Sequence, residues 1–143
     1  MASPAPTTAD PATPPVTTGT VHAVGDGMFS LSLPGTDYRI DLVIEGSPPA
    51  VGEKVSGTIH ARAQRVDVIS GGGRYVEPVF GRPRRVQGTI VGGDLNENAI
   101  FVAAGGANLV CVLTDPRQQA GQFNLSEMVT FDVERGARFT PKA

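Results

Sequence analysis

Apolar and polar residues alternate along much of this chain, and the alternation predicts short β-strands. Residues 28–33 and 38–44 each place an apolar side chain at every second position. A period of two is typical of a strand with one buried face. The expected core-facing residues of these two strands are Phe29, Leu31, Leu33, Tyr38, Ile40, Leu42 and Ile44. Phe29 and Tyr38 keep phase with aliphatic neighbours, so we expect both rings in the core.

The next strand changes phase along its length. Val55, Ile59 and Ala61 are expected to face inward, and His60 and Arg62 outward. Beyond residues 63–65 the inward positions become Val66 and Val68, with Arg65 and Asp67 facing out. One extra residue at the slip predicts a β-bulge, which lets a strand bend around a small barrel.

The second half of the chain repeats this organisation. Strands are expected at 86–90, 99–103, 109–113 and 129–133, and tight turns at 25–27, 34–37 and 94–98. The expected inward residues of the first and last of these strands are Val86, Gly88, Ile90, Val129, Phe131 and Val133, with Thr130 facing outward. Residues 115–121 form the one helical candidate, a turn or two at most, with Asp, Pro and Gly as start and stop signals.

Composition divides the chain into four segments. Residues 1–16 contain five prolines among Ala, Thr and Ser, so they cannot bury enough apolar surface to offset the loss of chain entropy, and a disordered arm is expected. Residues 17–70 and 86–141 form two β-rich halves, and residues 71–85 form a Gly/Arg-rich connector between them.

Two short motifs recur in both halves. Gly19-Thr20-Val21 opens the first half and Gly88-Thr89-Ile90 the second. Later in each half, Gly52-Glu53-Lys54-Val55 corresponds to Ser126-Glu127-Met128-Val129. A third copy, Gly57-Thr58-Ile59, blurs the period, so an internal duplication and a coincidence between β-rich segments both stay open.

The order of these features resembles that of the OB fold. Among OB folds, it is most similar to the OB-type repeat of ribosomal and cold-shock RNA-binding proteins. The resemblance rests on an opening GTV strand, a GMFSLSL strand and a VGEKVSGTI strand, and covers residues 18–69 best and 86–140 more loosely. It implies an all-β protein of OB-like small barrels, either in tandem or merged into one body. One departure is that Phe29 and Tyr38, on the strands that expose stacking aromatics in RNA-binding OB repeats, are expected in the core.

Few reactive groups stand out in the 143 residues. The single cysteine, Cys111, allows no intramolecular disulfide and lies in the apolar run 109–113, where it is expected to act as a small hydrophobe. No run of apolar residues approaches the ~20 of a membrane-spanning helix. Residues 1–16 contain no Lys or Arg and no apolar core, so no secretory signal and a cytoplasmic location are expected.

The sequence shows no catalytic constellation. The run 71–74 lacks the spacing and the Lys-Ser/Thr ending of a phosphate-binding loop. His22 and His60 are too few for a zinc site, and the further ligands that zinc needs are scattered. We therefore expect a non-enzymatic protein with no metal and no cofactor.

Charge is the one local anomaly. The whole chain has a formal charge of -2, and ten of its twelve basic residues are arginines, a bias typical of GC-rich bacterial genomes. Residues 62–85, however, carry six arginines against two acids, a local charge of +4, with Tyr75 and Phe80 among them. Arginine pairs with phosphates and stacks on bases, and exposed aromatics stack on single strands. The candidate binding residues are His60, Arg62, Arg65, Arg74, Tyr75, Phe80, Arg82, Arg84 and Arg85.

Two functions are compatible with this pattern. The first is a nucleic-acid-binding module for RNA or single-stranded DNA, using the arginine-rich connector and the adjacent strand face. The second is a protein-interaction or assembly module, whose strand edges and N-terminal arm would meet a partner protein and whose connector would be a solvated linker. The segregated arginines favour the first and the net acidity favours the second.

Overall fold

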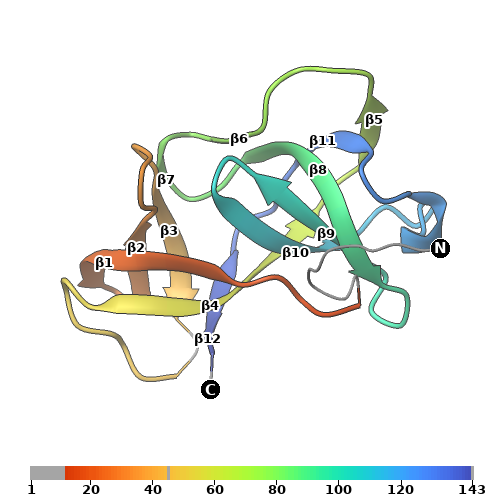
Figure 1. Ribbon diagram of the computed structural model, residues 1–143. Helices are drawn as coiled ribbons and strands as arrows, with labels where there is room; N and C mark the ends of the chain where they lie inside the picture. The colour runs from red at the N-terminus through yellow and green to blue at the C-terminus, as the bar shows by residue number, and fades with distance from the viewer. Residues whose placement is uncertain (1–11, 45, 143) are drawn as a thin grey trace, which may run out of the picture.

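The computed structural model describes residues 12–44 and 46–142, and within them it confirms an all-β fold with one 3-10 turn at Ala120–Gln122 (Figure 1). The strands are β1 (Thr17–Gly25), β2 (Met28–Ser32), β3 (Arg39–Ile44), β4 (Lys54–Ala63), β5 (Asp67–Ile69), β6 (Tyr75–Glu77), β7 (Phe80–Gly81), β8 (Arg85–Asp94), β9 (Ala99–Ala104), β10 (Ala107–Leu113), β11 (Met128–Asp132) and β12 (Arg138–Pro141). No helix in this part of the chain is long and apolar enough to cross a bilayer.

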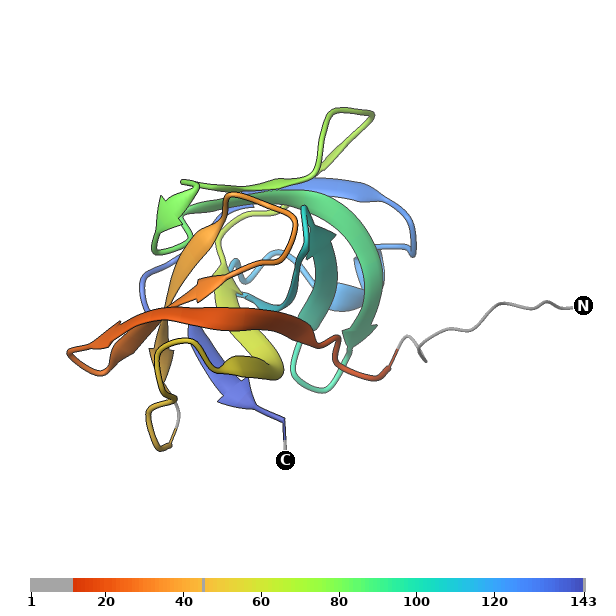
Figure 2. The same cartoon turned by 60° about the vertical axis from the view of Figure 1, so that its left-hand side comes forward.

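A closed five-stranded barrel, compatible with an OB-like fold, is built from β1, β2, β3, β12 and β4. The meander β1–β2–β3 is antiparallel, and β4 returns to pair with β1. The ring is closed by β12 from the far end of the chain, which pairs parallel to β3 and antiparallel to β4. Figures 1 and 2 show this blue strand among the orange and yellow strands of the first half.

A second ring of strands follows the same plan in the second half. The meander β8–β9–β10 is antiparallel, and β11 pairs with β8 as β4 pairs with β1. The far half of β4 completes this ring by pairing parallel to β10, and an isolated bridge between Ala63 and Val133 joins β4 to the end of β11. Each half thus supplies the strand that completes the ring of the other.

The two halves share one hydrophobic core. Leu31 and Leu42 of the first half, Val102 and Leu109 of the second, and Phe139 of the exchanged strand all belong to one cluster of buried side chains. Phe29 packs edge-on against Phe139, with ring centroids 5.2 Å apart. Since burial of apolar surface is the main stabilising term in folding, the structure is one body and not two barrels in tandem.

The register of the strands shows that the two halves are similar in detail. Val21 lies opposite Leu31 and Ile90 lies opposite Val102, and a β-bulge follows at the same place in β1 and in β8. Gly19 lies two residues before Val21, and Gly88 lies two residues before Ile90. A Cβ there would lie 2.6 Å from the carbonyl oxygen of Ser32 and 2.3 Å from that of Ala103, respectively, so only glycine fits.

The second repeated motif also adopts one structure twice. Gly52 and Ser126 both have positive φ, at 88° and 74°. The following residues, Glu53 and Glu127, each accept a hydrogen bond through Oε1 from the backbone N–H three residues earlier, at 3.0 and 2.8 Å. Their carbonyls accept from the amides of Val21 and Ile90, both at 2.9 Å. The similarity between the halves therefore extends to individual hydrogen bonds.

Most core positions expected from the sequence are confirmed. The inward residues of the expected strands are buried in every case except Tyr38, Ile44, Val55 and Val68, and the first three of these are partly buried against the core. Tyr38 keeps its hydroxyl at the edge of the core, where it accepts a hydrogen bond from the amide of Val76 at 3.2 Å. The expected turns at 25–27, 34–37 and 94–98 are also present.

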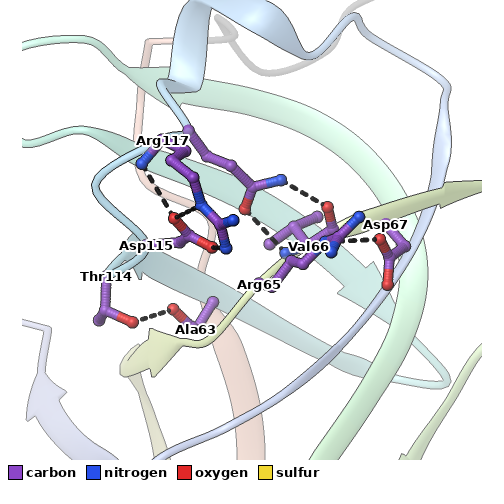
Figure 3. Close-up of polar contacts among 8 residues, drawn as sticks. Ala63, Arg65, Val66, Asp67, Thr114, Asp115 and Arg117 are labelled. Atoms are coloured by element: carbon purple, nitrogen blue, oxygen red, sulfur yellow. Dashed lines mark hydrogen bonds and ion pairs between the residues drawn. The ribbon is translucent and has the colours of Figure 1, made fainter.

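The expectation for Val68 is wrong, and so is the expected bulge at residues 63–65. The strand ends at Ala63 and β5 starts afresh at Asp67, with the backbone of Val66 held between by Gln118 through bonds of 2.8 and 2.7 Å (Figure 3). The side-chain amide of Gln118 thus makes the hydrogen bonds to the Val66 backbone that a neighbouring strand would otherwise make. β5 lies at the end of the strand order, where Val68 is 53% exposed.

One smaller expectation also needs correction. Thr130, expected to face solvent, is buried, because it lies on β11 between Gln87 of β8 and Asp67 of β5. Residues 115–121, expected to form a helical turn or two at most, contain a turn at 116–117 followed by the start of the 3-10 turn. Of the expected N-terminal arm, residues 1–11 lie outside the described residues, and 12–16 lead into β1 beside β10, where the Val16 carbonyl accepts a bond from Asn108 at 3.0 Å.

Candidate nucleic-acid interface

The structure distributes the nine candidate binding residues over several elements. Arg74, Tyr75 and Arg85 lie on or beside β6 and β8, while His60 and Arg62 lie on the outer face of β4. Arg65 follows β4, Phe80 lies on β7, and Arg82 and Arg84 lie between β7 and β8. What separates these groups chemically is whether their charges and hydrogen-bonding atoms already have partners in the protein.

The residues on β6 and β8 are engaged by neighbours. The Tyr75 hydroxyl donates to Oε1 of Gln87 at 3.1 Å, and Nε of Arg74 donates to the Thr89 hydroxyl at 2.7 Å. Arg85 forms an ion pair of 2.7 Å with Asp132, and the hydrogen bond in this pair raises the pKa of Arg85 above its ordinary value. These side chains already make the polar contacts that a phosphate or base would otherwise supply.

Three other arginines are also paired with carboxylates. Arg62 lies 3.1 Å from Glu134, and Arg65 lies 3.3 Å from Asp67. Arg117 closes back on Asp115 at 2.8 Å (Figure 3), and its side-chain and backbone hydrogen bonds lower the pKa of Asp115 to about 2. Exposed pairs of this kind stabilise the fold little, but they reduce the positive potential around each arginine.

Phe80 is placed differently, since its ring is 59% exposed on β7. This two-residue strand pairs parallel to the start of β3, where Arg39 lies opposite Phe80 and donates its backbone N–H to the carbonyl of Val79 at 2.9 Å. The Arg39 guanidinium carbon lies 4.9 Å from the centre of the Phe80 ring. The aromatic side chain is thus backed by a cation and open to solvent.

Arg82, Arg84 and Arg135 come together in the segments that follow β7 and precede β12. β7 and β12 both pair with the same edge of β3, so the chain segments that follow β7 and precede β12 meet there. The Val133 amide donates to the carbonyl of Arg84 at 2.8 Å, which fixes the two segments together. The pKa of Arg82 is lowered by desolvation and by the positive charges of Arg135 and Arg84.

We refer to Arg39, Phe80, Arg82, Arg84 and Arg135 as the β3-edge cluster. Within the described chain, none of its four arginines forms an ion pair with a carboxylate. The two acids nearest to Arg135 in sequence pair with other arginines, Glu134 with Arg62 and Asp132 with Arg85. The cluster therefore combines arginines that have no carboxylate partner among the described residues with an exposed aromatic residue.

Sequence reasoning found three of these five residues and missed Arg39 and Arg135. Arg39 had a usable signal, because it is an outward-facing position of an alternating strand. Arg135 had none, since it stands between Glu134 and Gly136 and reaches the cluster only through the pairing of β12 with β3. The fold thus adds Arg39 and Arg135 to the group of arginines that is already visible along the sequence.

Other chemistry is sparse in the residues that the structure describes. They contain no group of three or more His, Cys, Asp or Glu side chains arranged to hold a metal ion. Cys111 is completely buried, and burial raises the pKa of its thiol, so the reactive thiolate is disfavoured.

Comparison with protein-family models, with curated proteins and with solved structures finds no match.

Proposed function

We propose that this protein is a non-catalytic nucleic-acid-binding module, acting on RNA or single-stranded DNA through the β3-edge cluster. The observation that carries the proposal is the meeting of Arg82, Arg84 and Arg135, none paired with a carboxylate of the described residues, on the edge of β3 that also carries the exposed Phe80. A cytoplasmic location, expected from the sequence, belongs to the same proposal.

The electrostatics of the cluster favour an anion. Like charges held together destabilise one another, and the pKa of Arg82 is lowered by desolvation first and then by the positive charges of Arg135 and Arg84. A phosphodiester would relieve the repulsion, and guanidinium groups bind phosphate oxygens through paired, charge-assisted hydrogen bonds. Each bound phosphate also releases counterions, which adds to the affinity at low salt.

The aromatic residue favours a single strand. Arg39 backs the Phe80 ring, and the exposed part of that ring offers a surface on which an unstacked base can lie. Stacking on an aromatic side chain contributes ~1–3 kcal/mol per base and tolerates any sequence. In a duplex the base faces are already stacked, so this contact is available only to single strands and loops.

The remaining candidates would make a smaller contribution. Arg62, Arg65 and Arg85 have carboxylate partners, and Arg74 and Tyr75 have hydrogen-bond partners. Binding a phosphate at these residues would compete with contacts that already exist. They therefore serve as matched controls for the cluster.

The test is the salt dependence of binding to a fluorescein-labelled 12-nucleotide oligo-U, followed by anisotropy. A single strand gives a log–log slope of about -0.7 per phosphate neutralised. The variant R82A/R84A/R135A should lose affinity and bring the slope about 2 units closer to zero if each arginine contacts one phosphate. The control R62A/R65A/R117A removes the same charge from paired arginines and should keep most of the slope.

Phe80→Ala separates stacking from charge. It should weaken binding of the oligonucleotide about tenfold while keeping the slope nearly unchanged, because stacking releases few counterions. If the two triple variants lose the same affinity and slope, the effect comes from the overall charge of the protein and not from the β3-edge cluster. Absence of saturable binding at low salt would remove the nucleic-acid proposal.

One observation favours the second function, a protein-interaction or assembly module. Leu95 and Leu125 are 73% and 54% exposed, and they border a groove of about 350 Å³ that also includes Phe123 and Ala120. Exposed apolar residues around a groove are typical of a protein-binding surface. An assembly role predicts a concentration-dependent rise in mass by light scattering, which L95S/L125S should abolish and R82A/R84A/R135A should leave intact.

A further inference from the structure

A groove of about 470 Å³ crosses the outer face of β4, β10 and β9, and none of its lining residues belongs to the β3-edge cluster. Its lining follows two rows of paired residues across the sheet. One row runs from Arg138 through His60 and Val110 to Phe101, and the other from Arg62 through Val112 and Ala99 to Asp94. Pro14, from the segment that precedes β1, also lines the groove.

The floor of the groove is apolar. Ala99, Phe101 and Val110 form a buried cluster of their own on the outer face, with Val112 packed against it. This cluster is separate from the main core, which lies on the opposite face of the same strands. Outward positions of a strand are usually polar, so an apolar strip there is unusual. Ala99 and Phe101 are at most 1% exposed, so Val112 and the edge of Val110 are the part of the strip that a ligand can reach.

The two ends of the groove carry opposite charges. Arg62, His60 and Arg138 line one end, and Asp94 and Glu97 line the other. Oδ1 of Asp94 accepts the backbone N–H groups of Asn96 and Glu97 at 3.0 and 3.3 Å, so its carboxylate is held in a defined position at the turn after β8. Nε of Arg62 bonds to Glu134, so a carboxylate bound at this end would use the two terminal nitrogens and share the guanidinium with Glu134.

The separation of the charges can be derived from the sheet. Three strand-to-strand steps lie between Arg62 and Asp94, and neighbouring strands are ~4.8 Å apart, which gives about 14 Å. An extended peptide advances ~3.3–3.6 Å per residue, so four residues cover the same distance. The groove matches a tetrapeptide in length, with an anionic and a cationic group at its two ends.

We propose that this groove binds the C-terminal end of a partner protein, with the free α-carboxylate at Arg62 and a lysine or arginine three residues earlier at Asp94 and Glu97. The apolar segment between these charges lies over Val110 and Val112, with alternate side chains facing the groove. The acidic end repels a phosphodiester chain, which makes a peptide the favoured ligand over nucleic acid here. The proposal is independent of the function assigned to the β3-edge cluster.

The test uses acetyl-Lys-Val-Ala-Val with a free carboxyl terminus, titrated into the ¹⁵N-labelled full chain and followed by NMR. Saturable shifts are expected at the amides of β4, β9 and β10. The same peptide with an amidated C-terminus, and the one with Glu in place of Lys, should each bind at least about threefold more weakly, the effect of removing one partly exposed charge pair. These peptides test the groove without any change to the protein.

Two variants assign the ends of the peptide. D94N/E97Q should weaken the lysine peptide and leave a norleucine peptide unaffected, whereas Arg62→Gln should weaken the free acid and leave the amide unaffected. R82A/R84A/R135A, which tests the nucleic-acid function, should bind the peptide as the unmodified chain does, so the two proposals fail separately. No saturable shift at millimolar peptide, equal binding of acid and amide, or shifts of the groove amides by oligo-U alone would each overturn the groove proposal.

Discussion

The third strands of the two halves, β3 and β10, occupy equivalent places but carry different chemistry on their outer faces. Ile40 pairs with Leu31 as Leu109 pairs with Val102, so the register of the two strands is the same. The outward residues of β3 are Arg39, Asp41 and Val43, and those of β10 are Asn108, Val110 and Val112. One outer face is mainly polar, while the other is mainly apolar.

The second strands show the same contrast. Phe101 of β9, which is 1% exposed, occupies the position that Ser30 has in β2, where the hydroxyl donates to Asp41. The inner faces of both halves fill one core and are constrained alike, whereas the outer faces are not. The difference indicates that the repeated fold fixes the inner pattern and leaves the outer pattern free to acquire separate functions.

The largest expected effect comes from the outer faces. Phe101→Ala should lower the free energy of unfolding by ~3–5 kcal/mol, the usual cost of deleting a buried phenylalanine. Ser30→Ala, its counterpart, should cost about 1 kcal/mol because only one hydrogen bond to a partly buried carboxylate is lost. Urea denaturation of both variants measures the contrast. Similar losses would mean that the two outer faces bury their residues equally.

A medium effect is expected where the halves agree. Gly19→Ala and Gly88→Ala should each destabilise the protein by ~1–3 kcal/mol, because the new methyl group would overlap a backbone carbonyl of the neighbouring strand. Gly25→Ala, where nothing lies within 4 Å of the added Cβ, is the matched control and should have little effect. If Gly19→Ala and Gly88→Ala destabilise the protein by very different amounts, the two halves are less similar in packing than their strand registers indicate.

The inner pattern could be predicted from the sequence because it is local. Phe29, Leu31 and Leu33 alternate with polar residues whatever the strand pairs with. The repeated glycine and glutamate motifs pointed to similar halves, although the sequence left duplication and coincidence both open. The exchange of β4 and β12 between the rings could not be predicted. It depends on parallel pairings between residues far apart in the chain, such as Leu109 with Ile59.

The same limit applies to the candidate site. The arginines of the connector were visible as a local charge excess, but their ion pairs with distant acids were not. Arg85 meets Asp132 through the pairing of β8 with β11, and Arg39 meets Phe80 through that of β3 with β7. The same kind of long-range packing covers Thr130, whose hydroxyl is buried and has no hydrogen-bond partner among the described residues.

A smaller effect is expected from the segment that runs beside the apolar outer face. A chain that starts at Thr17 should be ~1–2 kcal/mol less stable than one that starts at Ala12, each preceded by Met. The shorter chain loses the bond from Asn108 to the Val16 carbonyl, and it loses Pro14 from the groove wall. Thermal unfolding of the two chains is the measurement. Equal midpoints would show that residues 12–16 do not stabilise this face.

The smallest effect concerns a loop that differs between the halves. In the second half, residues 114–118 anchor β10 to the end of β4, and Asp115 there is bonded to Arg117, which lowers the pKa of its carboxyl from 3.8 to about 2. A lowered folded-state pKa means that the folded protein binds this proton less readily than the unfolded chain. The contribution to stability is therefore fully present above about pH 4 and is lost as the pH falls through about 2.

Asp115→Asn tests this sign. The variant should match the unmodified protein at pH 2 and be slightly less stable at pH 5, so the difference between the two should appear as the pH rises between these values. NMR titration of the Asp115 carboxyl should give a midpoint near 2, and Arg117→Ala should move that midpoint toward its ordinary value. A stability difference that grows as the pH falls would contradict the assignment, since it would require a raised pKa and a buried, neutral carboxyl in place of the ion pair.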